Sequence, residues 1–208
     1  MINFEQLENN LDNLRLKYLT ANPFPHLVID DFCDEEKLNK AYQSIPELEN
    51  KSRDYAFANN KFEKSNYKVL GAELEELYND LSSERFNKIL SYIVNKEIFV
   101  DPKNHGGGLH QGKKNSFLDM HLDFNYHPIN KNWYRELNLL LYLNKEWKEE
   151  YKGHLKIVDL RTEEAAEIGV PFNRLIIQQC GPYTLHGYEM TSFPEGNYRT
   201  SIATYAYQ

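Results

Sequence analysis

Residues 116–124 read SFLDMHLDF, a short apolar-rich run of the kind that forms strands. In a strand, residues i and i+2 point to the same face, about 6.6 Å apart at roughly 3.3 Å per residue. His121 and Asp123 would therefore present an imidazole and a carboxylate side by side. Two such side chains can converge on one metal ion with bonds of roughly 2 Å.

Further runs of this kind follow one another from residue 98 to residue 208, with glycine or proline at or between them. They are IFVD at 98–101, RELNLLLYLN at 135–144, GHLKIVDL at 153–160, FNRLIIQQ at 172–179, TLHGYEM at 184–190 and YRTSIATYAY at 198–207. Short strands separated by such turn residues, following a block of helices, predict an antiparallel β-sandwich or barrel.

The first 97 residues have a different pattern, in which apolar residues recur three or four positions apart. The expected elements are helices over residues 3–20, 34–46 and 74–93, the last with a break at 82–83, and a strand over 24–32. Asp34 is expected to cap its helix. Residues 50–68 are polar without periodicity, which predicts a loop or a short irregular strand.

A chain of 208 residues is long enough for one domain with a substantial core. We expect a single domain over 1–208, with mostly helical support and one early strand over 1–97 and a β core over 98–208. The composition, 41% hydrophobic and 26% charged, is that of a soluble globular protein. Its net charge of −7 argues against a nucleic-acid partner.

The sequence carries no secretion signal and no apolar stretch near the roughly 20 residues of a membrane span, so we expect a cytoplasmic protein without a membrane partner. Its two cysteines, Cys33 and Cys180, lie far apart and in no metal-ligand spacing. We expect both to be reduced, buried thiols. The oligomeric state is left open by the sequence.

A transition-metal site built on His121 and Asp123 needs a third ligand, and His186 in the run 184–190 is the best candidate. Two histidines and one carboxylate on one face of an ion are typical of non-haem Fe(II) oxygenases, and they leave positions open for a cosubstrate and O2. A zinc hydrolase would use the same ligands but offers no general base. A metal-binding or ligand-binding module without oxidation is a further alternative.

Arg199 begins an otherwise uncharged alternating strand, which disfavours a merely solvated side chain. Its planar fork matches a carboxylate, and such charge-assisted bonds contribute about 1.5 to 3 kcal/mol when shielded from water. A dicarboxylate that chelates iron at one end could meet Arg199 at the other. In the run 135–144 every second residue from Leu137 is a leucine, so this face belongs to the core and Tyr142 points to the opposite face, toward Arg199.

These residues resemble the Fe(II)/2-oxoglutarate oxygenases of the prolyl-4-hydroxylase-like group. The matching motifs are HLDFNYH at 121–127, YLNKEW at 142–147, FNRLII at 172–177, LHGY at 185–188 and RTS at 199–201. The resemblance covers roughly residues 98 to 208, and PFPHLVIDDF at 23–32 also looks like the start of many members.

The resemblance implies a double-stranded β-helix, or jelly roll, buttressed by N-terminal helices. It implies a dioxygenase that hydroxylates a peptidyl proline, an amino acid or a small metabolite and releases succinate and CO2, with ascorbate as a candidate reductant. The implied iron ligands are His121, Asp123 and His186, and the implied 2-oxoglutarate residues are Arg199, Tyr142, Ser201, Asn138 and Leu140. The spacing from His186 to Arg199 is a few residues longer than in the hypoxia-type prolyl hydroxylases that the chain resembles. This difference predicts an extended turn around Pro194 and Gly196 at the mouth of the site.

Three further residues are candidates for substrate contact. His127 lies on the same alternation as His121 and Asp123, although the end of a strand is the simpler interpretation. Trp133 and Tyr134 follow in the next loop and are candidates for an aromatic wall of the substrate site, or for the core.

Two other histidines, His105 and His110, flank a triple glycine in the lysine-rich stretch 103–115. Such a stretch could recognise an acidic or phosphorylated substrate, but a solvated charged loop is the simpler interpretation. We therefore expect a loop here, directly before the strand that carries His121.

Overall fold

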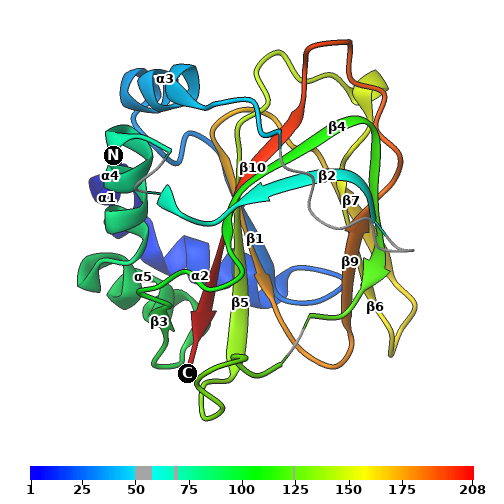
Figure 1. Cartoon of the computed structure of the whole chain (residues 1–208). Coiled ribbons are helices and arrows are strands. Elements are labelled where there is room, and N and C mark those ends of the chain that lie inside the picture. The colour runs from blue at the N-terminus through cyan, green and yellow to red at the C-terminus, as the bar shows by residue number, and fades with distance from the viewer. Residues whose placement is uncertain (50–57, 68–69, 124) are drawn as a thin grey trace.

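The strands form one antiparallel sheet that curls on itself, as the computed structural model in Figure 1 shows. The structure describes residues 1–49, 58–67, 70–123 and 125–208. Within them the main path of the sheet is β1 (His26–Ile29), β8 (Arg174–Gln179), β5 (Arg135–Tyr142), β10 (Arg199–Tyr207), β4 (Gly108–His121), β9 (Thr184–Tyr188), β6 (Leu155–Asp159) and β7 (Ala165–Ile168). In addition, β2 (Ala58–Lys64) pairs with β4, and β3 (Phe99–Val100) pairs with β10.

The long strand β4 belongs to both walls of this curled sheet. Its first residues, 108–112, pair with β10, whereas Leu118 and His121 pair with Tyr188 and His186 of β9. Between these regions the register of β4 with its other partner, β2, shifts between Gly112 and Phe117, and Asn115 has a positive φ of 60°. Such an irregularity bends a strand. The bend turns the sheet over, and the result is the jelly roll that the sequence predicted.

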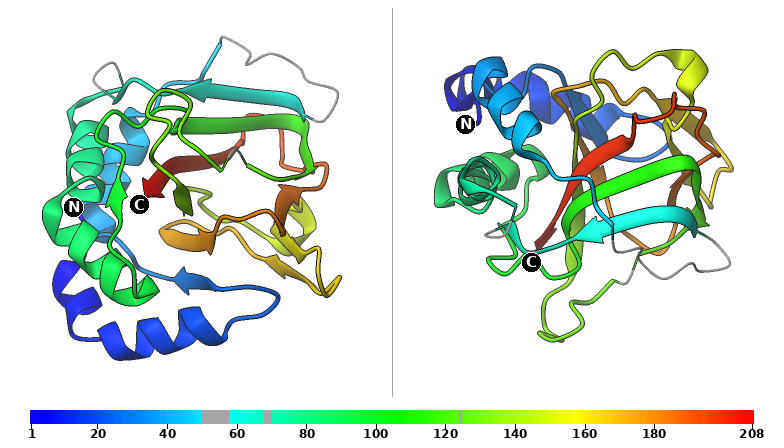
Figure 2. Two further views of the ribbon diagram at one scale, coloured as in Figure 1. Left: turned by 90° about the horizontal axis from the view of Figure 1, so that it is seen from below. Right: turned by 45° about the horizontal axis from the view of Figure 1, so that its top comes forward.

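Helices cover one side of the roll (Figures 1 and 2). They are α1 (Phe4–Glu8), α2 (Leu11–Thr20), α3 (Glu35–Ser44), α4 (Ala72–Leu81) and α5 (Glu84–Val94), and a short 3-10 turn, η2 (Glu149–Tyr151), lies among the strands. The side chain of Asp34 accepts a hydrogen bond from the Lys37 amide, and Ser83 does the same for Phe86, so both helix starts are capped. These caps confirm the predicted start at Asp34 and the predicted break at 82–83.

The two faces of β5 pack in different places, as its alternation predicted. The leucine face, which continues to Leu143, lies in the large core beneath the helices. Tyr142 points the other way, into a smaller core inside the roll with Leu155 and Ile157. The leucines therefore anchor the helical layer, and the polar face of β5 is left for the interior of the roll.

The structure corrects some of the expected elements and decides between the alternatives at one of them. The helix predicted over 3–20 is interrupted at Asn9 and Asn10, residues that favour turns over helix interiors. The stretch at 50–68, predicted as a loop or a short irregular strand, contains the irregular polar strand β2, which pairs with β4; residues 50–57 and 68 lie outside the described part. The loop predicted at 103–115 ends early, because β4 already begins at Gly108. The strand β7 was not predicted, since this edge strand is largely exposed and has no apolar alternation.

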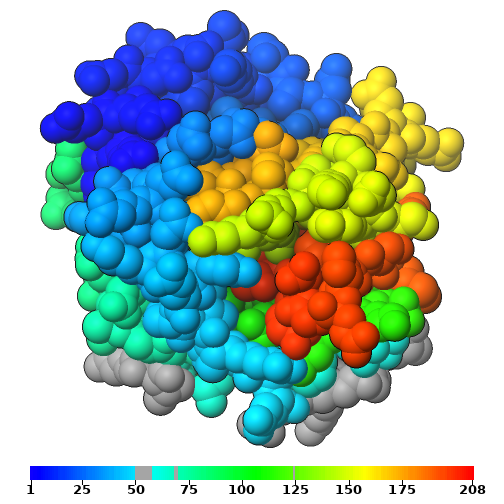
Figure 3. Space-filling view, turned by 90° about the horizontal axis from the view of Figure 1, so that it is seen from above, coloured from blue at the N-terminus to red at the C-terminus, as the bar shows by residue number. Residues whose placement is uncertain are grey.

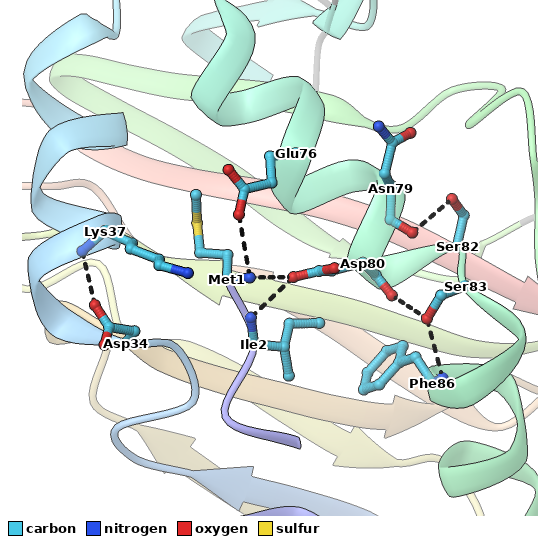
Figure 4. A network of polar contacts seen from close by, with 10 residues as sticks. All are labelled: Met1, Ile2, Asp34, Lys37, Glu76, Asn79, Asp80, Ser82, Ser83 and Phe86. Carbon is cyan, nitrogen blue, oxygen red and sulfur yellow. Dashed lines mark hydrogen bonds and ion pairs between the residues drawn. The ribbon is translucent and has the colours of Figure 1, made fainter. Parts of the chain in front are cut away.

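The first residues of the chain are tied to α4 by polar contacts, which Figure 4 shows. The amino group of Met1 pairs with Asp80 and Glu76, and the Ile2 amide donates to Asp80 Oδ2 at 3.0 Å. Ile2 also forms a β-bridge with Cys33. These contacts hold α1 against the helical layer.

Both cysteines are buried and unpaired, which confirms the expectation of free thiols. Burial raises the pKa of Cys33 and Cys180, which keeps both thiols protonated at neutral pH. In the part of the chain that the structure describes, no helix has the length and apolar character needed to cross a membrane. The cytoplasmic location stays a prediction.

Candidate metal centre

His121, Asp123 and His186 come together where β4 lies beside β9. The strand register pairs His121 with His186, and their ring centroids lie 4.3 Å apart. Asp123 Oδ2 is 3.6 Å from His186 Nε2, and Asp123 Oδ1 is 4.0 Å from His121 Nε2. One ligand atom from each residue lies within 4.8 Å of the others. Small side-chain rotations would bring all three onto one ion with bonds of roughly 2 Å.

The protonation of the three side chains suits a metal. Burial lowers the pKa of His186 to about 4, against the opposing charge of Asp123, so its imidazole is neutral at neutral pH. His121 Nδ1 lies 2.8 Å from the Asp119 carbonyl, which can only accept, so Nδ1 carries the proton and Nε2 keeps its lone pair. Burial alone would raise the pKa of Asp123, but His186 and Arg135 outweigh it and keep the carboxylate ionised.

Two residues of β5 contact the Asp123 carboxylate. Asn138 Nδ2 donates to Oδ2, and Arg135 Nη1 lies 3.2 Å from Oδ1. Asn138 was predicted as a cosubstrate residue, and it lines the same cavity as the metal ligands. Arg135 was not predicted as part of the site.

Arg199 lies at the other end of the cavity and is only 6% exposed. Its Nε donates to the Gly153 carbonyl at 2.7 Å, and its Nη2 donates to the Tyr142 hydroxyl at 3.3 Å. The guanidinium carbon sits 3.9 Å from the centre of the Tyr188 ring and 5.1 Å from that of Tyr142. Burial raises the pKa of Tyr142, so its hydroxyl stays protonated and can donate.

Gly153 is needed for this arrangement. Its φ is +74°, and a Cβ there would lie 3.1 Å from Arg199 Cδ. A larger residue would be strained and would push the guanidinium away from its carbonyl partner.

One cavity of about 110 Å³ joins the metal ligands to Arg199. All the predicted cosubstrate residues line it: Arg199, Tyr142, Ser201, Asn138 and Leu140. Ser201 pairs with Tyr142 on one side and with His110 on the other, so these three residues form one row across the cavity floor.

His110 and Tyr188 also line the cavity and were missed as site residues. Tyr188 could have been found, because it lies two residues after His186 on the same strand face. His110 was expected in a solvated loop, but it lies in β4 and its Nε2 is buried without a hydrogen-bond partner among the described residues. Burial lowers the pKa of His110 to about 3, so the imidazole is neutral.

The three candidate substrate residues lie elsewhere. Among the described residues, the cavity lining includes neither His127 nor Trp133 nor Tyr134. His127 is 2% exposed, faces Asp101 with an Nε2 to Oδ2 distance of 3.4 Å, and packs against the Trp133 ring. The Tyr134 ring packs edge-on against that of Tyr126. This packing matches the strand-end interpretation of His127, whereas Trp133 and Tyr134 are partly exposed.

The segment 189–198 between β9 and β10 is the predicted extended turn. The Ser192 amide donates to the Tyr151 carbonyl at 2.8 Å, and the rings of Tyr151 and Phe193 pack 5.5 Å apart. In Figure 3 this orange-red segment lies on the surface beside the yellow-green residues around 150. It leads directly into Arg199 at the start of β10.

The fold and this arrangement define a class of proteins: a jelly roll whose interior brings two histidines and a carboxylate into one cavity with a buried arginine. Residues 87–207, more than half of the chain, match the model of the 2OG-Fe(II) oxygenase superfamily. The chain belongs to this superfamily. A comparison with curated protein sequences gives no match.

Solved structures with the same fold come from distant organisms. One is a prolyl hydroxylase from Trichoplax adhaerens in complex with a hypoxia inducible factor oxygen degradation domain peptide fragment; it is 13% identical, with a TM-score of 0.64 over 98% of this chain and 91% of that one. A Pseudomonas putida prolyl-4-hydroxylase is 12% identical, with a TM-score of 0.65 over 96% and 99%. HygX from Streptomyces hygroscopicus, with nickel, 2-oxoglutarate and hygromycin B bound, is 12% identical, with a TM-score of 0.57 over 88% and 82%.

Proposed function

We propose that the protein is an Fe(II)- and 2-oxoglutarate-dependent dioxygenase that hydroxylates an organic substrate and releases succinate and CO2. His121, Asp123 and His186 would hold the iron. Arg199 and Tyr142 would bind the distal carboxylate of 2-oxoglutarate, with Ser201, Asn138 and Leu140 beside it. The observation that carries this proposal is a buried arginine that has no acidic partner among the described residues and shares its cavity with a candidate metal-binding triad.

The charge of Arg199 requires an anion. No carboxylate among the described residues pairs with Arg199, whose polar partners are a carbonyl and a phenol. An unpaired buried charge is costly by several kcal/mol, and stacking on Tyr188 offsets only about 2 kcal/mol of that cost. A carboxylate bound here would compensate the guanidinium and also accept from Tyr142.

The donor set at the other end fits a divalent transition metal. Two histidines and one carboxylate are ligands that such ions prefer, and their three ligand atoms lie within 4.8 Å of one another. A small dicarboxylic keto acid can thus reach the metal with one end and Arg199 with the other, inside a cavity of about 110 Å³. This double contact distinguishes the proposal from a zinc hydrolase, which gives Arg199 no role.

When bound together, Fe(II) and 2-oxoglutarate supply the activation of O2 and the oxidising power for inserting oxygen into a C–H bond. The residues of the chain prepare the site for this chemistry. His121 keeps its Nε2 unprotonated through the Asp119 carbonyl, and Asp123 stays ionised through its neighbours. The enclosing walls limit the access of water. Ascorbate would serve as an external reductant.

The substrate is proposed only as a class: a peptidyl proline, an amino acid or another small metabolite. Among the similar structures, one holds a peptide fragment and another holds hygromycin B. The fold therefore accepts both kinds of substrate, and a screen of both kinds is required.

The test is an anaerobic titration of the Fe(II)-loaded protein with 2-oxoglutarate, in which chelation produces a weak visible charge-transfer band. We expect the band in the wild type and its loss at the same 2-oxoglutarate concentration in Arg199→Gln, with iron still bound. Slow succinate release in air would follow. Absence of the band in the iron-loaded wild type would exclude the proposal and favour a non-oxidative binding module.

A further inference from the structure

Arg135 is a buried arginine at the start of β5 that no sequence pattern marked. It is 6% exposed. Its guanidinium carbon lies 3.9 Å from the centre of the Tyr205 ring and 5.9 Å from that of Tyr207. The two tyrosines of β10 thus form an aromatic support under the charged group.

The acidic partner of Arg135 is the candidate metal ligand Asp123, whose Oδ1 lies 3.2 Å from Arg135 Nη1. A second of its three nitrogens, Nε, is buried and has no hydrogen-bond partner among the described residues. An arginine that only filled the core would satisfy this group as well, because an unpaired buried donor costs about 1 to 3 kcal/mol. The guanidinium therefore directs one nitrogen at Asp123 and leaves Nε without a partner among the described residues.

A β-bulge in β5 sets the direction of the Arg135 side chain. On β5 the register with β10 shifts between Leu137, which faces Ala206, and Arg135, which faces Tyr207. In a regular strand Arg135 would share the face of Leu137 and point into the helical core. The extra residue, Glu136, turns Arg135 to the interior of the roll, and bulges next to active sites commonly redirect side chains in this way.

Asp123 needs such support because it lies beyond the end of β4. The preceding residue, Leu122, is 41% exposed, so local packing does not fix the carboxylate. Arg135 and Asn138 contact one carboxylate oxygen each. Together they contact both carboxylate oxygens from one strand, β5, which is separated from β4 by β10 in the sheet.

We propose that Arg135 is a positioning residue that holds the Asp123 carboxylate in the orientation in which it binds the metal. The inference rests on the proposed function, since it takes Asp123 as a metal ligand. An aligned carboxylate loses less conformational freedom when the metal binds, and loss of such an outer partner typically weakens metal binding 10- to 100-fold. The role is distinct from charge compensation alone, in which Arg135 would repel the cation and its removal would tighten binding.

The experiment measures the affinity of the metal-free protein for Co2+ under anaerobic conditions, by the visible absorption of the bound ion. The variants are Arg135→Met, which removes the charge and the fork, and Arg135→Lys, which keeps the charge. The matched control is Arg161→Met, because Arg161 pairs with a buried aspartate, Asp159, at 2.6 Å but lies outside the cavity lining. Thermal unfolding without metal is recorded for each variant.

We expect Arg161→Met to bind Co2+ with the affinity of the wild type. Arg135→Met should bind Co2+ about 10- to 100-fold more weakly and with an altered visible spectrum, and the affinity of Arg135→Lys should lie between the two. Unchanged or tighter Co2+ binding by folded Arg135→Met would overturn the inference, even if its unfolding temperature fell. If Arg135→Met does not fold, Arg135→Lys decides: wild-type affinity and spectrum would overturn the inference. A wild type that binds no Co2+ would instead overturn the proposed function, and the inference with it.

Discussion

Replacing Arg199 with glutamine is expected to weaken 2-oxoglutarate binding by one to two orders of magnitude while leaving the metal centre intact. Arg199 is 6% exposed, and its guanidinium is fixed by the Gly153 carbonyl and by stacking on Tyr188. A carboxylate bound there meets a donor that is already oriented and shielded from water. Glutamine keeps an amide donor but removes the positive charge and the paired N–H donors of the guanidinium.

The magnitude follows from the interactions lost. A hydrogen bond to a charged group contributes about 1.5 to 3 kcal/mol, and each 1.4 kcal/mol or so is a factor of about ten in affinity. Loss of the charge-assisted contact therefore corresponds to a dissociation constant about 10- to 150-fold higher. The metal ligands are on β4 and β9 or just beyond β4, so the affinity for Co2+ should change less than about threefold.

The assay is anaerobic calorimetric titration of the Co2+-loaded protein with 2-oxoglutarate, alongside Arg174→Gln as the control. Arg174 is also a strand arginine, but it pairs with Asp30 at 2.7 Å and lies outside the cavity lining. Equal 2-oxoglutarate affinity in Arg199→Gln and the wild type would refute the assignment of the anion site. If Arg199→Gln also lost its affinity for Co2+, the idea that the metal ligands and the anion site at Arg199 act independently would be refuted.

Three further results are expected. Asp123→Asn, which keeps the size of the side chain but removes its charge, should abolish 2-oxoglutarate-dependent succinate release, and full activity would contradict the ligand assignment. The pKa of His110 is about 3, against an ordinary value of 6.5, so between these pH values the unfolded chain takes up a proton that the folded chain does not. The free energy of unfolding should therefore fall as the pH drops from about 6.5 toward 3. In urea titrations, His110→Gln should make this decline less steep. Gly187→Ala places a Cβ 2.5 Å from the Leu118 carbonyl oxygen, so it should lower both the unfolding temperature and the Co2+ affinity, whereas Gly181→Ala, with open space at its Cβ, should change neither.

Much of this architecture could be predicted because its signals are local. The alternation in β5 separated the leucine face from Tyr142, and the i, i+2 spacing placed His121 and Asp123 together. The helix caps at Asp34 and Ser83 follow from side-chain chemistry within a few residues. In each case the pattern spans only a few neighbouring residues, although Asp123 itself lies just beyond the end of β4.

The remainder depends on partners that are distant in sequence. Arg135 could not be placed, because the bulge that redirects it is visible only in the pairing with β10. His110 follows a triple glycine and precedes two lysines, so its sequence resembles a solvated loop, yet β2 and β10 pair on either side of it. The polar strand β2 likewise becomes a strand only through β4.

The continuity of β4 has a consequence for ligand length. Gly112 lies opposite Arg199, and His121 lies opposite His186, so one unbroken strand sets the separation between the anion-binding arginine and the metal ligands. We expect dicarboxylates one carbon shorter or longer than the proposed five-carbon cosubstrate to bind more weakly, because this strand links the positions of the two ends that they must meet. A single-residue insertion between the two pairings would turn His121 to the opposite face, because side chains alternate with a period of two. Selectivity for ligand length would thus depend on the residue count of β4 as well as on the side chains that contact the ligand.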